Sequence, residues 1–260
     1  MSADHLTQTL TAIAHRYPED MIAAQVADVP RIAFHIRTTL AAASPKPAKE
    51  IAVADLGGGV GLFSVGMAGM GVKRSVLVDD FGDPVNRRMG EDDPLKIHEQ
   101  EGVEIVSRDV IAVGIGDLPG TFDVITSFES MEHWHHSPKR LFGEVIDKLN
   151  PEGSFVLGVP NCSDLAKRIL TPLGRAKWSY MDTWYEQEVF RGHVREADVD
   201  DLRYIARDLG LRDTKILGRY FPGESHLPAL IGAAMNALHI PSLCSSIYLV
   251  GRRPSVLATF

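Results

Sequence analysis

The sequence has few cysteines: only Cys162 and Cys244 occur among its 260 residues. Neither belongs to a C-x-x-C pair or to a Cys/His set at zinc spacing, so we expect neither a disulfide framework nor a zinc site of that kind. Isolated cysteines are typical of a reducing compartment. Because the first residues also contain Asp4 and no apolar segment of the secretory type, the expected location is cytoplasmic.

Positive charge is scarcer than negative charge. The chain has 27 lysines and arginines against 34 aspartates and glutamates, which gives a net charge of −7. This balance argues against a nucleic acid as the main partner. A hydrophobic fraction of 45% over 260 residues is enough for one large domain with a core of its own.

Long stretches without charge are nearly absent. The exception is 227–250, which contains no Asp, Glu, Lys or Arg. Its length would suit a membrane span of about 20 residues, but Pro228 and Pro241 interrupt it. The segment therefore predicts a buried helix, a turn and a buried strand, with contact at a membrane surface as the alternative.

From residue 51 onward, short apolar runs alternate with helical patterns. The runs are rich in β-branched residues and end in turn residues, and they predict strands over 51–55, 75–80, 103–109, 122–128 and 154–160, with a last one in 245–252. Helical patterns cover 60–71, 137–150 and 196–209. In the 137–150 helix we expect Ser137 as the N-cap and Pro138 at the first helical position. The alternation predicts an α/β fold whose sheet is parallel and covered by helices on both faces.

The domain boundaries follow composition. Residues 1–48 are alanine-rich and predict an N-terminal helical extension, in which a helix over 21–43 is interrupted near Pro30. A proline-rich joint at 44–50 then leads into a main domain over 49–260.

The loop DLGGGVG (55–61) joins a predicted buried strand to a predicted helix. Glycines at this position let the backbone approach a ligand at the carboxyl end of the sheet. The pattern is not a Walker loop, and Leu62 stands where a dinucleotide fingerprint needs its third glycine, which disfavours a nicotinamide dehydrogenase. The glycine loop alone is a weak indication of a ligand site. The indication is stronger here because Asp55 precedes the glycines and a second acid, Asp79, ends the next predicted strand.

These landmarks, taken in order, resemble the class I S-adenosylmethionine-dependent methyltransferases, well over 50–160 and more loosely over 190–253. The resemblance implies a three-layer sandwich with a Rossmann-like, seven-stranded, mostly parallel sheet, and S-adenosylmethionine as cofactor. It assigns Asp79 to the ribose hydroxyls, Asp109 with Val110 to the adenine, and Ser127 with Phe128 to the methionine end. The full set of expected cofactor residues is Asp55, Gly57, Gly58, Gly59, Asp79, Asp80, Asp109, Val110, Ser127 and Phe128.

Methyl transfer to a hydroxyl benefits from a general base, and histidine is suited to this near neutral pH. The candidates are His133, in a Glu-His pair after the fourth strand, and His193, before a predicted helix. A structural role for each is the alternative. We expect His135 and His136 to face solvent or to cap the next helix, and His226 falls further along the chain.

Residues 161–193 predict a helical substrate cover. This insert contains the aromatic residues Trp178, Tyr180, Trp184 and Tyr185, which would line a pocket together with Trp134 or would be ordinary core residues. It also contains the basic residues Lys167, Arg168, Arg175 and Lys177. These would bind a phosphate or carboxylate of a nucleotide-linked or lipid-linked acceptor, or would form a solvated helix face.

The residues around the end of the fourth predicted strand argue against several kinds of methyltransferase. Ser127-Phe128-Glu129-Ser130 lacks the motif of nucleic-acid amino methyltransferases. Ser127 stands where metal-dependent catechol-type relatives carry an aspartate, so we expect a metal-independent enzyme. The predicted function is S-adenosylmethionine-dependent methylation of a small molecule, most simply at a hydroxyl, by a monomer or homodimer. The alternative is a non-catalytic cofactor-binding or regulatory protein on the same fold.

Overall fold

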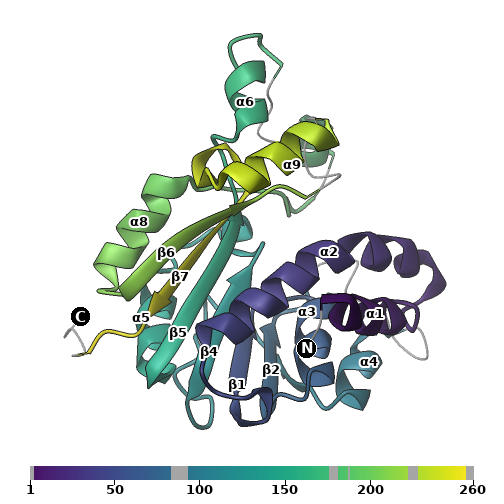
Figure 1. Ribbon diagram of the computed structural model, residues 1–260, viewed down its shortest axis with the longest axis vertical. Helices are drawn as coiled ribbons and strands as arrows, with labels where there is room; N and C mark the ends of the chain where they lie inside the picture. Colours follow the sequence, from purple (N-terminus) through teal and green to yellow (C-terminus); the bar gives the residue numbers. More distant parts are fainter. Residues whose placement is uncertain (1–2, 83–92, 176–180, 187, 222–227, 256–260) are drawn as a thin grey trace.

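Seven strands form a single sheet in the order β3-β2-β1-β4-β5-β7-β6 (Figure 1). The computed structural model describes residues 3–82, 93–175, 181–186, 188–221 and 228–255. The strands are β1 (Ala52–Leu56), β2 (Arg74–Asp79), β3 (Glu104–Ser107), β4 (Phe122–Phe128), β5 (Leu149–Pro160), β6 (Arg212–Arg219) and β7 (Ser246–Arg252). The predicted seven-stranded sheet is confirmed.

Strands β1 to β5 are parallel to one another, and β7 is antiparallel to both β5 and β6. The chain builds outward from β1 through β2 to β3 and then crosses over to β4, on the other side of β1. The order of the strands therefore reverses between β1 and β4. Open α/β sheets bind their ligands at such a reversal, beyond the carboxyl ends of the strands.

Two hydrophobic cores, one on each face of the sheet, make the three layers. On one face Val53, Val124 and Val156 pack against α1 (Ala3–Ala14), α2 (Glu19–Ala42), α3 (Leu62–Gly69) and α4 (Leu95–Gln100). On the other face Ala54 and Ile125 pack against α5 (Lys139–Lys148) and α8 (Val199–Asp208). Successive strand residues alternate between the cores because side chains in a strand point alternately to opposite faces.

The helix α2 differs from the prediction because it runs through Pro30 without interruption (Figure 1). Proline removes one backbone hydrogen bond from a helix interior. Val29, Ile32 and Ile36 nevertheless lie buried in the core beneath this helix, and burial of three such side chains is worth several kcal/mol. Packing therefore keeps the helix intact where its local sequence would break it.

Two helices begin later than predicted. In α5 the N-cap is Pro138, not Ser137, whose Oγ instead accepts a hydrogen bond of 3.3 Å from Lys139 N. Helix α8 begins at Val199 because the Asp198 side chain accepts from the backbone N–H groups of Asp200 and Asp201. These capping bonds satisfy donors that the first turn of a helix leaves unpaired.

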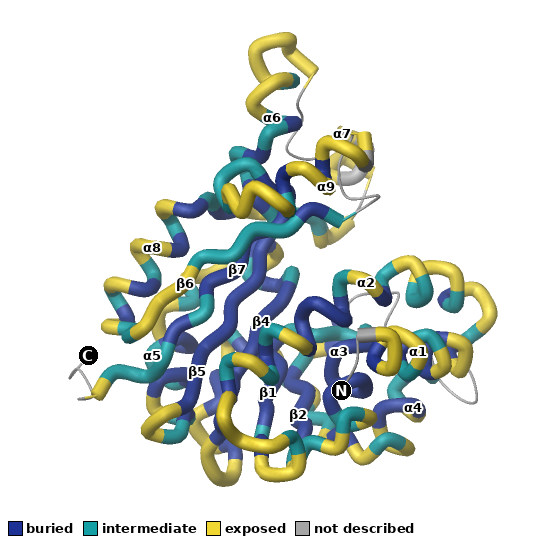
Figure 2. Tube along the Cα trace, in the orientation of Figure 1, coloured by how far each residue is buried: buried dark blue, intermediate teal, exposed yellow. Residues whose placement is uncertain are grey.

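The uncharged stretch 227–250 forms α9 (Ala229–Leu238), a short 3-10 turn at Pro241–Leu243 and strand β7. The strand is buried as predicted. The prediction of a buried helix was wrong, because Leu230 is 81% and Leu238 66% exposed, although Met235 is buried. Figure 2 shows this exposed helix near the end of the molecule that also carries α6 (Leu165–Leu170) and α7 (Met181–Tyr185). Among the described residues, no helix has both the length and the apolar character needed to cross a membrane.

Candidate active site

A cavity of about 660 Å³ opens at the carboxyl ends of β1, β2 and β4, where the strand order reverses. The expected cofactor residues line it, apart from Ser127. Ser127 is fully buried on β4, and its Oγ has no hydrogen-bond partner among the described residues. The structure therefore brings together the ends of three strands, as predicted, but leaves Ser127 outside the lining.

The glycine loop needs its glycines for two different reasons. Gly57 has φ +74°, and a Cβ built on it would lie 2.7 Å from Ser130 Cβ. At Gly58 a Cβ would lie 2.0 Å from Asp55 Oδ2. The first residue thus adopts a backbone conformation that side chains disfavour, and the second leaves room for a buried carboxyl group. The bare backbone of Gly57, Gly58 and Gly59 lines the cavity, and we call it the glycine cradle.

Asp55 holds this cradle to the sheet. Its carboxyl group is buried and accepts hydrogen bonds from Thr126 Oγ1 on β4, at 2.8 Å, and from Ser64 Oγ on α3, at 3.2 Å. Burial raises the pKa of Asp55 to about 7, although both hydrogen bonds oppose the shift. Asp55 therefore joins β1, β4 and α3 beneath the loop.

The acids at the ends of β2 and β3 are held by backbone donors. Asp79 Oδ2 accepts from Gly59 N at 2.9 Å and its Oδ1 from Phe81 N at 2.6 Å. Asp109 Oδ1 accepts from Ile111 N at 2.8 Å. Each carboxylate oxygen has a second lone pair, so the groups keep a fixed orientation and can still accept hydrogen bonds from a ligand in the cavity.

The N-terminal helix α2 supplies a wall of the cavity that sequence reasoning missed. The His35 ring stacks on Phe128, with 4.0 Å between centroids and 8° between planes. His35 Nε2 lies 3.0 Å from the Tyr248 hydroxyl on β7. Burial, with a smaller effect from Arg31, holds the pKa of His35 well below its usual value. His35 is therefore neutral and acts as an aromatic surface. Asp28, Arg31 and Ile32 of the same helix also line the cavity.

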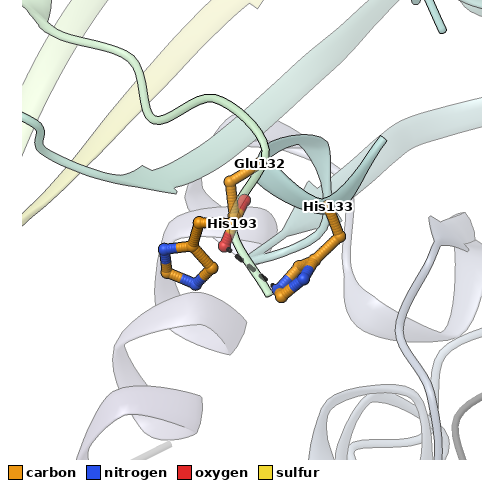
Figure 3. A group of neighbouring side chains, drawn as sticks. All are labelled: Glu132, His133 and His193. Atoms are coloured by element: carbon orange, nitrogen blue, oxygen red, sulfur yellow. Dashed lines mark ion pairs between the residues drawn. The ribbon is translucent and has the colours of Figure 1, made fainter. Parts of the chain in front are cut away.

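Glu132, His133 and His193 form a cluster at one edge of the cavity (Figure 3). His133 Nδ1 lies 2.8 Å from the carbonyl oxygen of Arg191, so this nitrogen carries the proton and Nε2 carries the lone pair. His193 Nδ1 lies 2.7 Å from Glu196 Oε1. The two imidazole rings meet edge to face, with their centroids 4.9 Å apart.

Backbone hydrogen bonds bring these two distant histidines together. The N–H groups of Val194 and Arg195 donate to the carbonyl oxygen of Glu132, at 2.7 and 3.2 Å. The loop before α8 is thereby joined to the 3-10 turn Met131–His133. His133 lines the cavity, whereas His193 lies beside it and outside the lining. His135 and His136 are exposed and lie at the cavity edge.

Glu132 is only 2% exposed. Burial, followed by the negative charges of Glu129 and Glu196, raises the pKa of Glu132 to about 9. Its Oε2 has no hydrogen-bond partner among the described residues. Nothing in the sequence pattern predicts that this acid is buried, because charged residues after a strand are usually solvated.

The predicted substrate cover contributes little to the cavity among the described residues. Trp184 and Tyr185 are exposed and lie outside the lining, whereas Arg191 and Trp134 belong to it. Lys167 pairs with Glu196, and Arg168 donates to the Ser163 and Ser242 carbonyl oxygens. These two basic residues thus make internal contacts. The predicted roles of Trp178, Tyr180, Lys177 and His226 fall outside the described residues.

A second cavity, of about 910 Å³, lies between α8, β6 and the 241–243 turn. Its lining includes Arg203, Arg207 and His239 but none of the residues predicted for cofactor or catalysis. Since it also lies away from the reversal of strand order, the smaller cavity is the candidate active site.

Replacing Gly57 tests the cradle. Gly57→Ala should lower the free energy of unfolding by about 1–3 kcal/mol, because alanine is strained at positive φ and its Cβ would meet Ser130. Gly61→Ala is the matched control, since its nearest contact would be ordinary, 3.5 Å from Gly58 O. Urea unfolding measures both variants. Equal losses in the two would contradict the assigned strain.

The raised pKa of Asp55 predicts a pH-dependent stability. The folded state holds the proton of Asp55 up to about pH 7, whereas an unfolded aspartate releases it near pH 4. This stabilising contribution is complete below pH 4 and is lost as the pH rises through 7. In Asp55→Asn the loss is absent, so the variant should gain stability relative to wild type between pH 5 and 8 in urea unfolding.

Asp123→Asn is the control, because its stability relative to wild type should change with pH in the opposite direction. Burial acts to raise the pKa of Asp123, but hydrogen bonds from Lys46, Ala52 N and Asn150 outweigh it and lower the pKa. Its stabilising contribution therefore appears as the pH rises, and the variant should lose stability relative to wild type from about pH 3 to 5. A parallel response of both variants would show that the Asp55 assignment is wrong.

Comparison with known proteins places this site in a family. Residues 28–216 match the family model described as "Methyltransferase domain". No curated protein matches the chain. A cyclopropane-fatty-acyl-phospholipid synthase-like protein from Lactobacillus casei superposes with a TM-score of 0.59 at 11% identity, covering 94% of this chain and 99% of that one.

Two further solved structures share the fold. An S-adenosylmethionine-dependent methyltransferase from Thermotoga maritima has a TM-score of 0.52 at 17% identity, with 93% of this chain and 99% of that chain covered. Phosphoethanolamine N-methyltransferase 2 from Haemonchus contortus, in complex with S-adenosylmethionine, has a TM-score of 0.52 at 14% identity, with coverage of 85% and 52%. The family model spans well over half of the chain, and the chain therefore belongs to the methyltransferase-domain family as a class I S-adenosylmethionine-dependent enzyme.

Proposed function

We propose that this enzyme methylates a hydroxyl group of a small-molecule acceptor. His133 and His193 are the proposed general-base residues for removal of the hydroxyl proton. The observation that carries the proposal is His133. Its Nδ1–H donates to the Arg191 carbonyl oxygen, so Nε2 carries the lone pair. His133 itself lines the cavity. A positioned imidazole with that tautomer can accept a proton near neutral pH.

The cavity fits the cofactor on its own features. The bare loop at Gly57 and Gly59 allows close approach of a ligand, and Asp79 offers oriented carboxylate oxygens for a pair of hydroxyls. Asp109 and Val110 lie at the end of β3, where we assign them to the adenine. Bound S-adenosylmethionine supplies a methyl group on a sulfonium centre. The protein's share is to hold acceptor and methyl group close and aligned.

Methyl transfer from labelled S-adenosylmethionine to matched pairs of alcohols and amines tests this function. We expect product with the alcohols. Asp79→Asn should weaken the affinity for S-adenosylhomocysteine at least about tenfold, or about 1.4 kcal/mol, because it removes a charge-assisted acceptor. Asp208→Asn, which alters a surface pair with Lys139, should keep both affinity and turnover.

The outcomes separate the alternatives. Binding of S-adenosylhomocysteine with no transfer to any acceptor would support a non-catalytic binding protein. Transfer to the amine of each pair but not to the alcohol would contradict the hydroxyl assignment and leave the methyltransferase assignment intact.

We also propose that the acceptor is lipid-linked. The helices α6, α7 and α9 lie at one end of the molecule (Figure 2). Large apolar residues in and next to these helices are exposed, among them Ile169, Leu173, Met181, Trp184, Leu230 and Leu238. Exposed apolar patches of this kind mark contact surfaces. A weak lipid contact there would bring a membrane-borne acceptor to the enzyme.

Vesicle binding tests this surface. Burial of a leucine side chain is worth about 1.5 kcal/mol or more, so Leu230→Ser and Leu238→Ser should each weaken binding to phosphatidylcholine vesicles by about tenfold in a co-sedimentation assay. Val113→Ser, at an exposed apolar residue that follows β3, should leave it unchanged. The same partition for all four proteins would exclude the proposed contact.

A further inference from the structure

We propose that Glu132, His133 and His193 bind one divalent transition-metal ion, with zinc as the best-suited probe. Each residue offers one ligand atom, and the three atoms lie within 4.8 Å of one another. Two imidazoles and one carboxylate are a ligand set that zinc uses in catalytic sites, where a fourth position stays open. Imidazole nitrogen also favours zinc and its neighbours over magnesium.

The hydrogen bonds of both imidazoles are those of metal ligands. His133 Nδ1 donates to a backbone carbonyl, that of Arg191, and His193 Nδ1 pairs with the Glu196 carboxylate. A histidine that binds a metal through one nitrogen characteristically uses the other in this way, which fixes the tautomer and the ring direction. In both residues Nε2 would then be the coordinating nitrogen.

The carboxylate is the second, independent observation. Glu132 is 2% exposed and its Oε2 has no hydrogen-bond partner among the described residues. Its Oε1 lies 3.9 Å from His133 Nε2, and Figure 3 shows the carboxylate between the two rings. Burying a carboxyl group without a hydrogen-bond partner is costly, and a bound cation would supply a partner.

Of the three neighbouring acids, Glu132 is the one without a lysine or arginine partner among the described residues. Arg31 lies 3.9 Å from Glu129, and Lys167 pairs with Glu196, whereas Glu132 approaches the His133 ring, at 3.9 Å. A cation at the cluster would give this carboxyl group its partner.

The three ligand atoms must approach one another by about an ångström at most to close around an ion. Ligands held about 2.0–2.2 Å from zinc lie about 3.3–3.6 Å apart in a tetrahedron. The 3.9 Å between Glu132 Oε1 and His133 Nε2 exceeds this by a few tenths of an ångström, and the ligand atoms of the three residues lie within 4.8 Å of one another. Side-chain rotation can supply the difference, since both rings are partly exposed. The backbone already holds the two loops together through Val194 and Arg195.

The position of the site suggests what the ion would do, and this step alone rests on the proposed hydroxyl acceptor. Because His133 lines the cavity, an open coordination position would face the acceptor. A hydroxyl bound to the ion would lose its proton to water more readily than a free one. With the ion bound, His133 Nε2 is a ligand and does not accept that proton, so the ion, and not the imidazole, would promote its loss. A metal ion here would depart from the expectation of a metal-independent enzyme, which was drawn from Ser127.

Zinc titration of the chelator-treated, dialysed full-length protein tests the site. We expect one zinc ion per chain, with binding followed by calorimetry and by competition with a chromogenic chelator. Glu132→Gln and His193→Asn should each weaken zinc affinity at least tenfold, whereas His239→Ala, at an exposed histidine outside the cluster, should not. Cobalt bound in place of zinc should give a visible absorption band that both cluster variants lose.

Failure of wild type to bind zinc more tightly than Glu132→Gln would overturn the site, as would equal binding by all variants. Because Glu132 is buried, Glu132→Gln could unfold the chain, and His193→Asn, on a partly exposed residue, then decides. Binding of S-adenosylhomocysteine is measured in the same samples. If zinc binds but methyl transfer to alcohols is absent, the metal site stands and the proposed function fails.

Discussion

The parallel pairing of β1 with β4 is the constraint on which the rest of the molecule depends. It places Asp55 opposite Thr126 and joins them by a buried hydrogen bond. Because β2 pairs on the other side of β1, the loops after three strands open at one edge of the sheet. The glycine cradle, Asp79 and the 3-10 turn with His133 meet there for this reason, and the hydrogen bond from Gly59 N to Asp79 then joins two of them.

Most of this edge could be predicted from the sequence, because its signals are local. Buried parallel strands appear as short apolar runs, and the glycines reveal a close approach of the backbone at Gly57 and Gly58. The wall formed by α2 could not be predicted in that way. An amphipathic helix shows that one of its faces is buried, but not against which sheet, and Pro30 suggested a break that burial of Val29 and Ile32 prevents.

The histidine cluster marks the limit of sequence reasoning more sharply. His133 and His193 were each predicted as candidates, yet 60 positions separate them in the numbering and no pattern indicates that they meet. They meet because backbone donors of Val194 and Arg195 satisfy the carbonyl oxygen of Glu132. Such a bond depends on the relative placement of two loops. The burial of Glu132 likewise depends on what covers it.

Burial of Glu132 is hard to explain by stability alone. A carboxyl group in this position faces two other acids, Glu129 and Glu196, and burying a charged group costs several kcal/mol even when it is paired. An apolar residue of similar size would pack there at lower cost. Glu196 is different, because it holds both Lys167 and the His193 ring. The acids next to the cavity thus have two roles: Glu196 orients the His193 ring, and Glu132 is a buried carboxyl group whose Oε2 has no hydrogen-bond partner among the described residues. That carboxyl group, next to two oriented imidazoles, is the group that the proposed metal ion would bind.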